Sequence, residues 1–147
     1  MQIQDFINTI EEWSPTSQAE DFDNVGLLVG NASTNLIGVL ITLDTTEDII
    51  DEAIEKKCNL IVSFHPIIFS GIKKLTQSSY VEKVIIKAIE NKISIYSIHT
   101  SLDNHKKGVN YKISERIGLV NSKILIPNKK NNSIGMGRIG KLEHPME

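Results

Sequence analysis

Two short apolar segments of this chain each run directly into a histidine. Residues 59–63 lead into Phe64 and His65, and residues 93–98 lead into His99. Both segments have the length and the Ile-rich composition of strands buried on both faces, as strands of parallel sheets are. Ligand-binding groups gather beyond the carboxyl ends of such strands, where regular backbone ends. The pattern therefore predicts a buried sheet with two imidazoles at one edge.

The remaining apolar residues predict helices that alternate with strands. After a first, hairpin-like pair of strands, this alternation indicates βαβ crossovers and hence an α/β fold. We expect a mostly parallel or mixed sheet flanked by helices, with segment 36–43 apolar enough to be buried on both faces. Helices are predicted at 3–13, 49–54, 81–89 and 111–117, and further strands at 25–30, 36–43, 124–126 and 134–142.

The polar residues that follow the second predicted strand have the chemistry of a helix start. Asp44, Thr45 and Thr46 precede the helical stripe, and Glu47 stands three residues after Asp44, as in a capping box. These side chains are therefore predicted to satisfy backbone N–H groups of the first helical turn.

Size and charge limit the classes of protein that the chain can belong to. A length of 147 residues predicts one α/β domain, 1–147, and 40% hydrophobic residues suffice for a core. The net charge of −2 gives no electrostatic case for binding nucleic acid or an anionic membrane. The lysine pairs at 73–74, 106–107 and 129–130 are interpreted as solvated loop charges rather than phosphate sites.

The single cysteine, Cys58, excludes an internal disulfide framework and a Cys-rich zinc site. The N-terminus lacks the pattern of a signal peptide, and no apolar run is long enough to cross a bilayer. These features predict a reduced, cytoplasmic protein.

His65, His99 and Asp103 are the residues that could hold a metal ion. A lone histidine at a strand end would more simply cap a loop by bonding a backbone carbonyl. However, Asp103 follows His99 by four residues, across a predicted turn at 100–102, so both can face one crevice. Histidine nitrogen with aspartate oxygen suits Zn, Mn or Fe(II), and a bound cation would lower the pKa of its water.

Other polar residues of the chain have simpler explanations. His105 lies in a lysine-rich loop and His144 near the terminus, so both are interpreted as passive. Asn24 and Asn110 are consistent with turn and helix-start chemistry, respectively. The chain has no Walker loop, G-x-G-x-x-G or G-x-S-x-G motif, which argues against P-loop NTPases, Rossmann dehydrogenases and serine hydrolases.

Taken together, five segments resemble the NIF-three-like family, whose members are often labelled GTP cyclohydrolase I type II homologues. Order and spacing match over nearly the whole chain. The segments are Asp23-Asn24-Val25-Gly26-Leu27, Ser63-Phe64-His65-Pro66-Ile67-Ile68-Phe69, His99-Thr100-Ser101-Leu102-Asp103, Gly108-Val109-Asn110 and Gly-Arg-Ile-Gly at 137–140.

The resemblance implies an α/β fold around a dinuclear divalent-metal site, in subunits that assemble into ring-like hexamers. Carried over by position, it makes His65 and Asp103 ligands of one metal ion, with His99 close to the site. Asn24 and Asn110 fall in matching motifs as supporting residues.

Two departures from the family pattern concern the second metal ion. The family has two adjacent histidines where this chain has Phe64 and His65, and phenylalanine cannot coordinate a metal. The family also supplies a histidine and a bridging glutamate from a C-terminal segment that would lie beyond Glu147. We therefore expect the N-terminal part of the fold, truncated at the C-terminus, holding one weakly bound ion rather than two.

Two functions are consistent with these residues. The first is a metal-dependent, hydrolase-like protein that acts on a phosphorylated or nucleotide-like small molecule. The second is a non-catalytic binding or assembly module, a truncated or split relative that keeps the fold. In either case we expect a homo-oligomer, or pairing with a separately encoded C-terminal half, because a shortened sheet exposes an unpaired edge.

Overall fold

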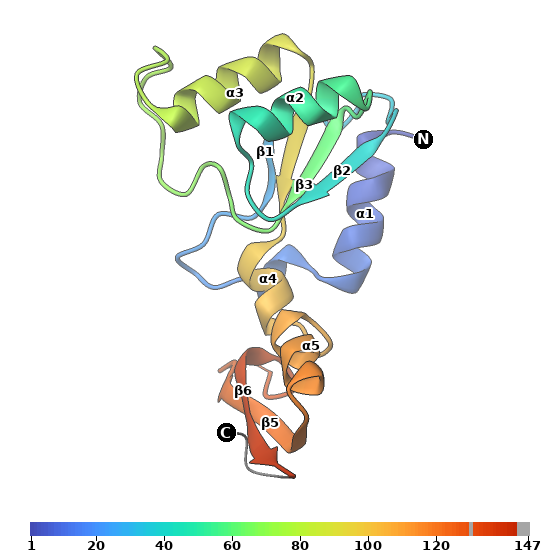
Figure 1. Cartoon of the computed structure of the whole chain (residues 1–147), viewed down its shortest axis with the longest axis vertical. Helices are drawn as coiled ribbons and strands as arrows, with labels where there is room; N and C mark the ends of the chain where they lie inside the picture. Colours follow the sequence, from blue (N-terminus) through green and yellow to red (C-terminus); the bar gives the residue numbers. More distant parts are fainter. Residues whose placement is uncertain (130, 144–147) are drawn as a thin grey trace.

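The structure of the chain is a computed structural model that describes residues 1–129 and 131–143 (Figure 1). A four-stranded sheet with helices on both faces forms one end, and a two-stranded hairpin forms the other. The elements are α1 (Ile3–Trp13), η1 (Thr16–Gln18), β1 (Gly26–Val29), β2 (Val39–Thr42), α2 (Glu47–Glu55), β3 (Leu60–Ser63), α3 (Tyr80–Glu90), β4 (Ser94–Ser97), α4 (His99–Asn104), α5 (Val109–Arg116), β5 (Leu119–Pro127) and β6 (Gly135–Leu142).

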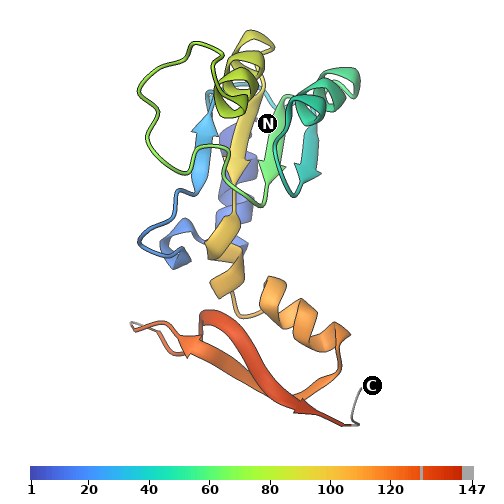
Figure 2. The same cartoon turned by 60° about the vertical axis from the view of Figure 1, so that its left-hand side comes forward.

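The main sheet has the strand order β1-β4-β3-β2, which Figure 2 shows from a second side. Strands β2, β3 and β4 run parallel, and β1 runs antiparallel to β4. The prediction of a mixed, mostly parallel α/β sheet is therefore confirmed. The predicted hairpin-like pairing of the first two strands is wrong, because β1 and β2 form opposite edges of the sheet.

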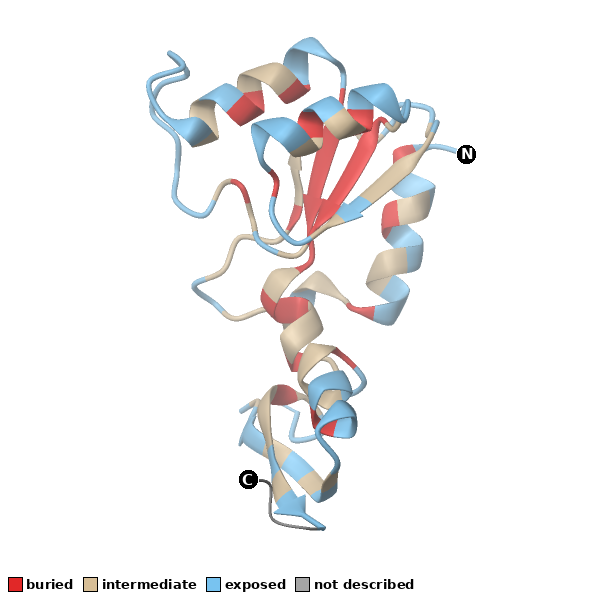
Figure 3. Ribbon diagram, in the orientation of Figure 1, coloured by how far each residue is buried: buried red, intermediate tan, exposed pale blue. Residues whose placement is uncertain are grey.

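The alternation of side chains along β3 divides the core into two layers. Leu60 and Val62 face α1, whose own Ile3 and Ile7 are buried against them. Ile61 faces the other side, where it packs in one cluster with buried residues of α2 and α3. Figure 3 shows the two central strands, β3 and β4, as the continuously buried part of the sheet.

Strand β2 is less buried than its sequence predicts. It lies at the edge of the sheet, and Ile41 is 78% exposed, so the prediction of burial on both faces is wrong. Val39 and Leu40 are packed only partly against the two core clusters. An apolar strand with one free edge is thus left on the surface of the molecule.

The residues after β4 form a helix rather than the predicted turn. Helix α4 has no side-chain cap of its own at Ile98. Instead, the carboxylate of Asp23, which is 77 positions distant in sequence, accepts the backbone N–H of Thr100 at 3.1 Å. Asp23, from a distant part of the chain, therefore accepts a first-turn N–H group for which the local sequence provides no hydrogen-bond acceptor.

The last predicted strands form the β5–β6 hairpin, which contacts α4 and α5. The Arg138 guanidinium of β6 donates to the carbonyl of Lys106 at 2.7 Å, beside the loop between these helices. Among the described residues, no helix has the length and hydropathy needed to cross a bilayer.

The glycine after β1 supports a first prediction, which concerns stability. Gly30 has φ +105°, and a Cβ there would lie 2.1 Å from Ser94 Oγ and 2.8 Å from Ser94 Cα. We expect Gly30→Ala to lower the free energy of unfolding by about 2 kcal/mol, since backbone strain and overpacking add. Denaturant unfolding measures this loss.

The control for this substitution is Gly71→Ala. An added Cβ at Gly71 meets no atom within 4 Å. The control should stay within about 0.5 kcal/mol of the parent chain. Equal losses of stability in the two variants would show that the close approach to Ser94 is not what requires a glycine at position 30.

Candidate functional site

Backbone hydrogen bonds beyond the strand ends bring the two predicted histidines together. The N–H of His65 donates to the carbonyl of Leu43 at 2.9 Å, and that of His99 donates to the carbonyl of Phe64 at 3.0 Å. These bonds continue the parallel ladder past the regular ends of β3 and β4. The His65 and His99 rings consequently meet edge to face, with centroids 5.6 Å apart.

His65 is oriented by a carboxylate from the neighbouring strand end. Its Nδ1 lies 2.7 Å from Asp44 Oδ1, just beyond the carboxyl end of β2. Both side chains are about half exposed, at 47% and 55%. The predicted capping role of Asp44 is wrong, because Thr46 is the N-cap of α2 and accepts the N–H of Ile49.

His99 is oriented by a second, buried carboxylate. Its Nδ1 lies 2.8 Å from Asp23 Oδ1, and the Asp23 side chain has no exposed surface. Asp23 also accepts the hydroxyl and the N–H of Thr100 and the N–H of Asn24. Burial alone would raise the pKa of Asp23, but the hydrogen bonds from Thr100, His99 and Asn24 lower it overall. His99 itself has φ +26°, an uncommon conformation that these contacts hold in place.

The two histidine–aspartate pairs determine which nitrogen of each imidazole ring is available to bind a ligand or a metal ion. An ionised carboxylate only accepts hydrogen bonds, so Nδ1 of each imidazole carries a hydrogen, and in the neutral form of the ring Nε2 has the lone pair. Within the described residues, no hydrogen bond is formed to Nε2 of His65 or of His99. A carboxylate on the far nitrogen is also the arrangement that orients histidine ligands in metal sites.

Asp103 is the third member of this group. It lies one helical turn after His99 on α4, so the two side chains project from the same face. Burial raises the pKa of the Asp103 carboxyl, and the nearby Asp23 raises it further, while His99 and His65 act in the opposite direction. Its carboxylate accepts no hydrogen bond from the described residues, although it is partly withdrawn from water.

The predicted supporting residues hold the backbone on either side of the site. The side-chain amide of Asn24 donates to the carbonyl of Ile68 at 2.6 Å, which fixes the loop that follows His65. The amide of Asn110 donates to the backbone carbonyl of Asp103 at 3.1 Å. Neither amide bonds a candidate ligand atom, so both residues position segments of the chain.

Phe64 lies between the candidate ligands and the core. Its ring contacts the rings of His65 and His99 at centroid distances of 5.1 and 5.5 Å. It also packs on the α1 side of the sheet, as expected for an aromatic residue under the loop. At this position the chain offers the site an apolar wall instead of a ligand.

The remaining histidines are separate from this group. His105 stacks edge to face on Trp13 at 5.5 Å, and its pKa is lowered by burial and by Lys107. His105 is thus partly buried rather than fully solvated, and its passive role stays a prediction. His144 lies outside the described residues.

Sequence reasoning missed Asp44 and Asp23 as members of the site. Asp44 follows β2, which runs parallel to β3, so the carboxyl ends of the two strands lie at the same edge of the sheet. Its position directly after a predicted strand could therefore have identified Asp44 as a site residue. Asp23 precedes β1, and only the antiparallel pairing of Gly26 with Ser97 brings it to the same edge. No local pattern reveals that pairing.

The donor atoms fit a single divalent ion in part. Imidazole nitrogen and carboxylate oxygen are ligands of Zn, Mn and Fe(II). In the part of the chain that the structure describes, however, no three His, Cys, Asp or Glu side chains are placed to hold one ion. The described residues thus form an open and incomplete set of ligands.

The fold and the site define an α/β protein with two carboxylate-oriented histidines at the carboxyl edge of its sheet. Residues 1–147 match the family described as Duf34/NIF3 (NGG1p interacting factor 3), and the chain belongs to this family. It is 44% identical, over 99% of its length, to a "GTP cyclohydrolase 1 type 2 homolog" of Clostridium acetobutylicum. It is 35% identical over 90% of its length to human "NIF3-like protein 1".

Solved structures agree with this assignment. A hypothetical protein of Staphylococcus aureus superposes with a TM-score of 0.89 at 29% identity, covering 98% of this chain and 59% of its own. Reduced HcgD from Methanocaldococcus jannaschii superposes with a TM-score of 0.83 at 31% identity, covering 95% and 54%. The chain covers 55% of the Clostridium relative and 35% of the human one, so it spans about half of their length or less.

A second prediction concerns the buried Asp23. Because its folded pKa is below the ordinary value of 3.8, its carboxylate stabilises the fold above about pH 4, and this contribution is lost as the pH falls through the folded pKa. Asp23→Asn should lower the free energy of unfolding by about 1–3 kcal/mol near neutral pH. The deficit relative to the parent chain should shrink in acid, which denaturation at several pH values measures.

Asp21→Asn serves as the control for Asp23→Asn. Asp21 is exposed, and removing its charge should change stability by less than about 0.5 kcal/mol at any pH. An Asp23→Asn deficit that stays constant from neutral to acid pH would contradict the ionised network.

Proposed function

We propose that the chain binds one divalent metal ion through His65 and Asp103. The observation that carries the proposal is the orientation of His65 by Asp44 through Nδ1, which leaves Nε2 without a hydrogen-bond partner among the described residues. Asp103 adds a partly buried carboxylate that accepts no hydrogen bond from the described residues. A cation would remove the unfavourable burial of that charge, and the mixed nitrogen and oxygen donors favour Zn, Mn or Fe(II).

His99 is proposed as a neighbour of the ion rather than a ligand. Its Nδ1 is held by the buried Asp23, and its ring faces that of His65. In this position Nε2 can accept or return a proton at the edge of the site. Asp23 and Asp44 then keep the two rings in one tautomer and one orientation.

The activity that these residues favour is a metal-dependent, hydrolase-like reaction on a phosphorylated or nucleotide-like small molecule. When bound, a divalent ion acts as a Lewis acid and would lower the pKa of a water molecule bound to it. The naming of relatives as GTP cyclohydrolase 1 type 2 homologues supports this class. We place the reaction in the cytoplasm, in keeping with the single, free Cys58.

The alternative is a non-catalytic binding or assembly module. The lack of a three-residue ligand set among the described residues favours it, as does Phe64 in place of a ligand. Under this alternative the chain holds at most one weakly bound ion and catalyses no reaction. The metal content and metal affinity of the purified chain separate the two functions.

We also propose that the chain works as an assembly, either with copies of itself or with a separate C-terminal half. Support comes from β2, whose free edge and 78% exposed Ile41 carry no charge that would block pairing.

The metal prediction is tested by elemental analysis and calorimetric titration. After mild dialysis the chain should retain about one equivalent of Zn, Mn or Fe(II), as expected for ligands oriented by carboxylates. His65→Ala and Asp103→Asn should each weaken binding by about tenfold to a hundredfold or more. His105→Ala removes a histidine outside the site and should leave binding unchanged. Substantially less than one equivalent of metal in the parent chain would rule out the enzymatic function.

The assembly prediction is tested by sedimentation velocity. The parent chain should self-associate, and Ile41→Lys should shift it toward the monomer because a lysine at a sheet edge opposes pairing. Ile54→Lys places the same charge on α2, at a residue that is 42% exposed, and should have no such effect. A monodisperse monomer for the parent chain would contradict self-association.

A further inference from the structure

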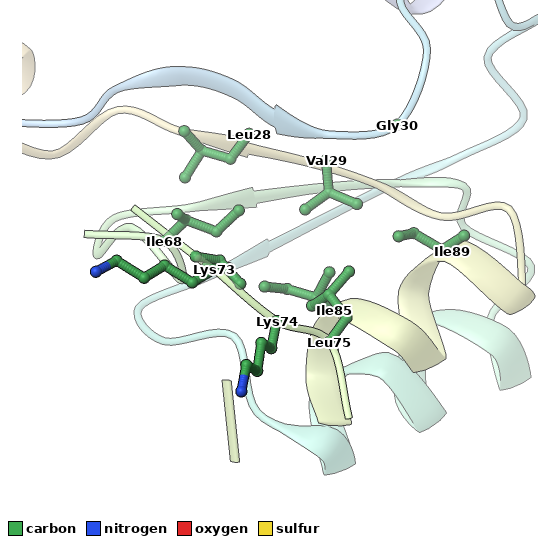
Figure 4. A pocket seen from close by; sticks show the side chains of 10 residues that line it. Leu28, Val29, Gly30, Ile68, Lys73, Lys74, Leu75, Ile85 and Ile89 are labelled. Atoms are coloured by element: carbon green, nitrogen blue, oxygen red, sulfur yellow. The ribbon is translucent and has the colours of Figure 1, made fainter. Parts of the chain in front are cut away.

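A second feature of the molecule is an open apolar groove between β1, α3 and the loop that joins β3 to α3 (Figure 4). Its volume is about 550 Å³, within the range of small-molecule sites. The walls are aliphatic side chains from all three segments, and none of the candidate metal ligands lines the groove. The apolar lining residues are Leu28, Val29, Ile68, Ile72, Leu75, Ile85 and Ile89.

In the part of the chain that the structure describes, two lysines are the charged residues of this lining. Lys73 and Lys74 come from the loop, and Figure 4 shows their ammonium groups at the margin of the aliphatic cluster. Neither lysine has an ion pair or hydrogen bond with the described residues. No aspartate or glutamate of the described residues lines the groove, so both charged groups at its rim are cationic in a chain of net charge −2.

Part of the aliphatic lining is in contact with water. Leu75 is 47% exposed and Ile89 is 54% exposed, although they face a shared hollow. Covering such surfaces with another apolar group is favourable. Apart from the two lysines, the described side chains of the lining are aliphatic and form no hydrogen bonds with a polar ligand. The complementary ligand is therefore an aliphatic chain with a negative charge at one end.

From this complementarity we propose that the groove binds a medium-chain fatty carboxylate. The alkyl chain lies on Leu28, Ile85 and Ile89, and the carboxylate meets the ammonium groups of Lys73 and Lys74. This binding is independent of the proposed metal function, because the two sites share no residue. The two sites are nevertheless adjacent along the chain, since the loop that leaves His65 reaches the groove at Ile68.

The experiment is calorimetric titration of the 147-residue chain with decanoate, below the concentration at which it forms micelles. We expect saturable binding with one site. Octanoate should bind on the order of tenfold more weakly, because two fewer methylene groups leave water. Raising the salt concentration should weaken decanoate binding, since the cationic rim is exposed.

Variants test the two halves of the groove separately. The double variant Lys73→Gln/Lys74→Gln should weaken decanoate binding by about tenfold and leave the binding of decanol, which is uncharged, unchanged. Leu75→Glu places a carboxylate on the exposed loop and should abolish decanoate binding without affecting the core. The control Lys83→Gln/Lys92→Gln removes the same charge from exposed lysines outside the groove and should bind like the parent chain.

Several outcomes would overturn the proposal. Absence of saturable decanoate binding would do so, and so would equal binding of decanoate by the parent chain and the Lys73/Lys74 double variant. Binding of decyl phosphate but not decanoate would replace the carboxylate with a phosphate ligand. Metal binding by the Leu75→Glu variant should remain at the parent level, which separates a failure of this site from a failure of the metal site.

Discussion

The parallel hydrogen bonds that join β2, β3 and β4 are the interaction on which the rest of the structure depends. Their continuation beyond the strands, through Leu43, Phe64 and the histidines, sets adjacent chain ends side by side. Because the three carboxyl ends share one edge, Asp44, His65 and His99 reach the same small region. The backbone hydrogen bonds of the sheet place these residues, and the contacts with Asp44 and Asp23 orient the imidazole rings.

Much of the fold followed from local patterns in the sequence. The helices around Ile3, Ile50 and Val84 have apolar stripes, and the strands at residues 60–63 and 94–97 are short buried runs, so each signal lies within its own segment. What the sequence could not reveal was which segments become neighbours. Strand β2 has the composition of an interior strand and yet forms an edge, because no further strand of the described residues lies beside it.

The candidate site was predictable to the same extent. The contact between the His65 and His99 rings required only a parallel sheet. Asp103 follows His99 by one helical turn, and its role as a ligand stays a prediction. The pairing of Asp23 with His99 and Thr100 required the antiparallel placement of β1, which no local signal encodes. The helical form of α4 was missed for the same reason, since its first-turn partner comes from the other end of the domain.

The wide separation of Asp23 from His99 and Thr100 has a consequence for the order of folding. Hydrogen bonds between residues 76 and 77 positions apart close a large loop, whose entropic cost must be met before the contacts form. The core strands, which pair over shorter separations, can form without them. The ligand edge is thus completed only when β1 docks, and the orientation of the His99 ring depends on that long-range step.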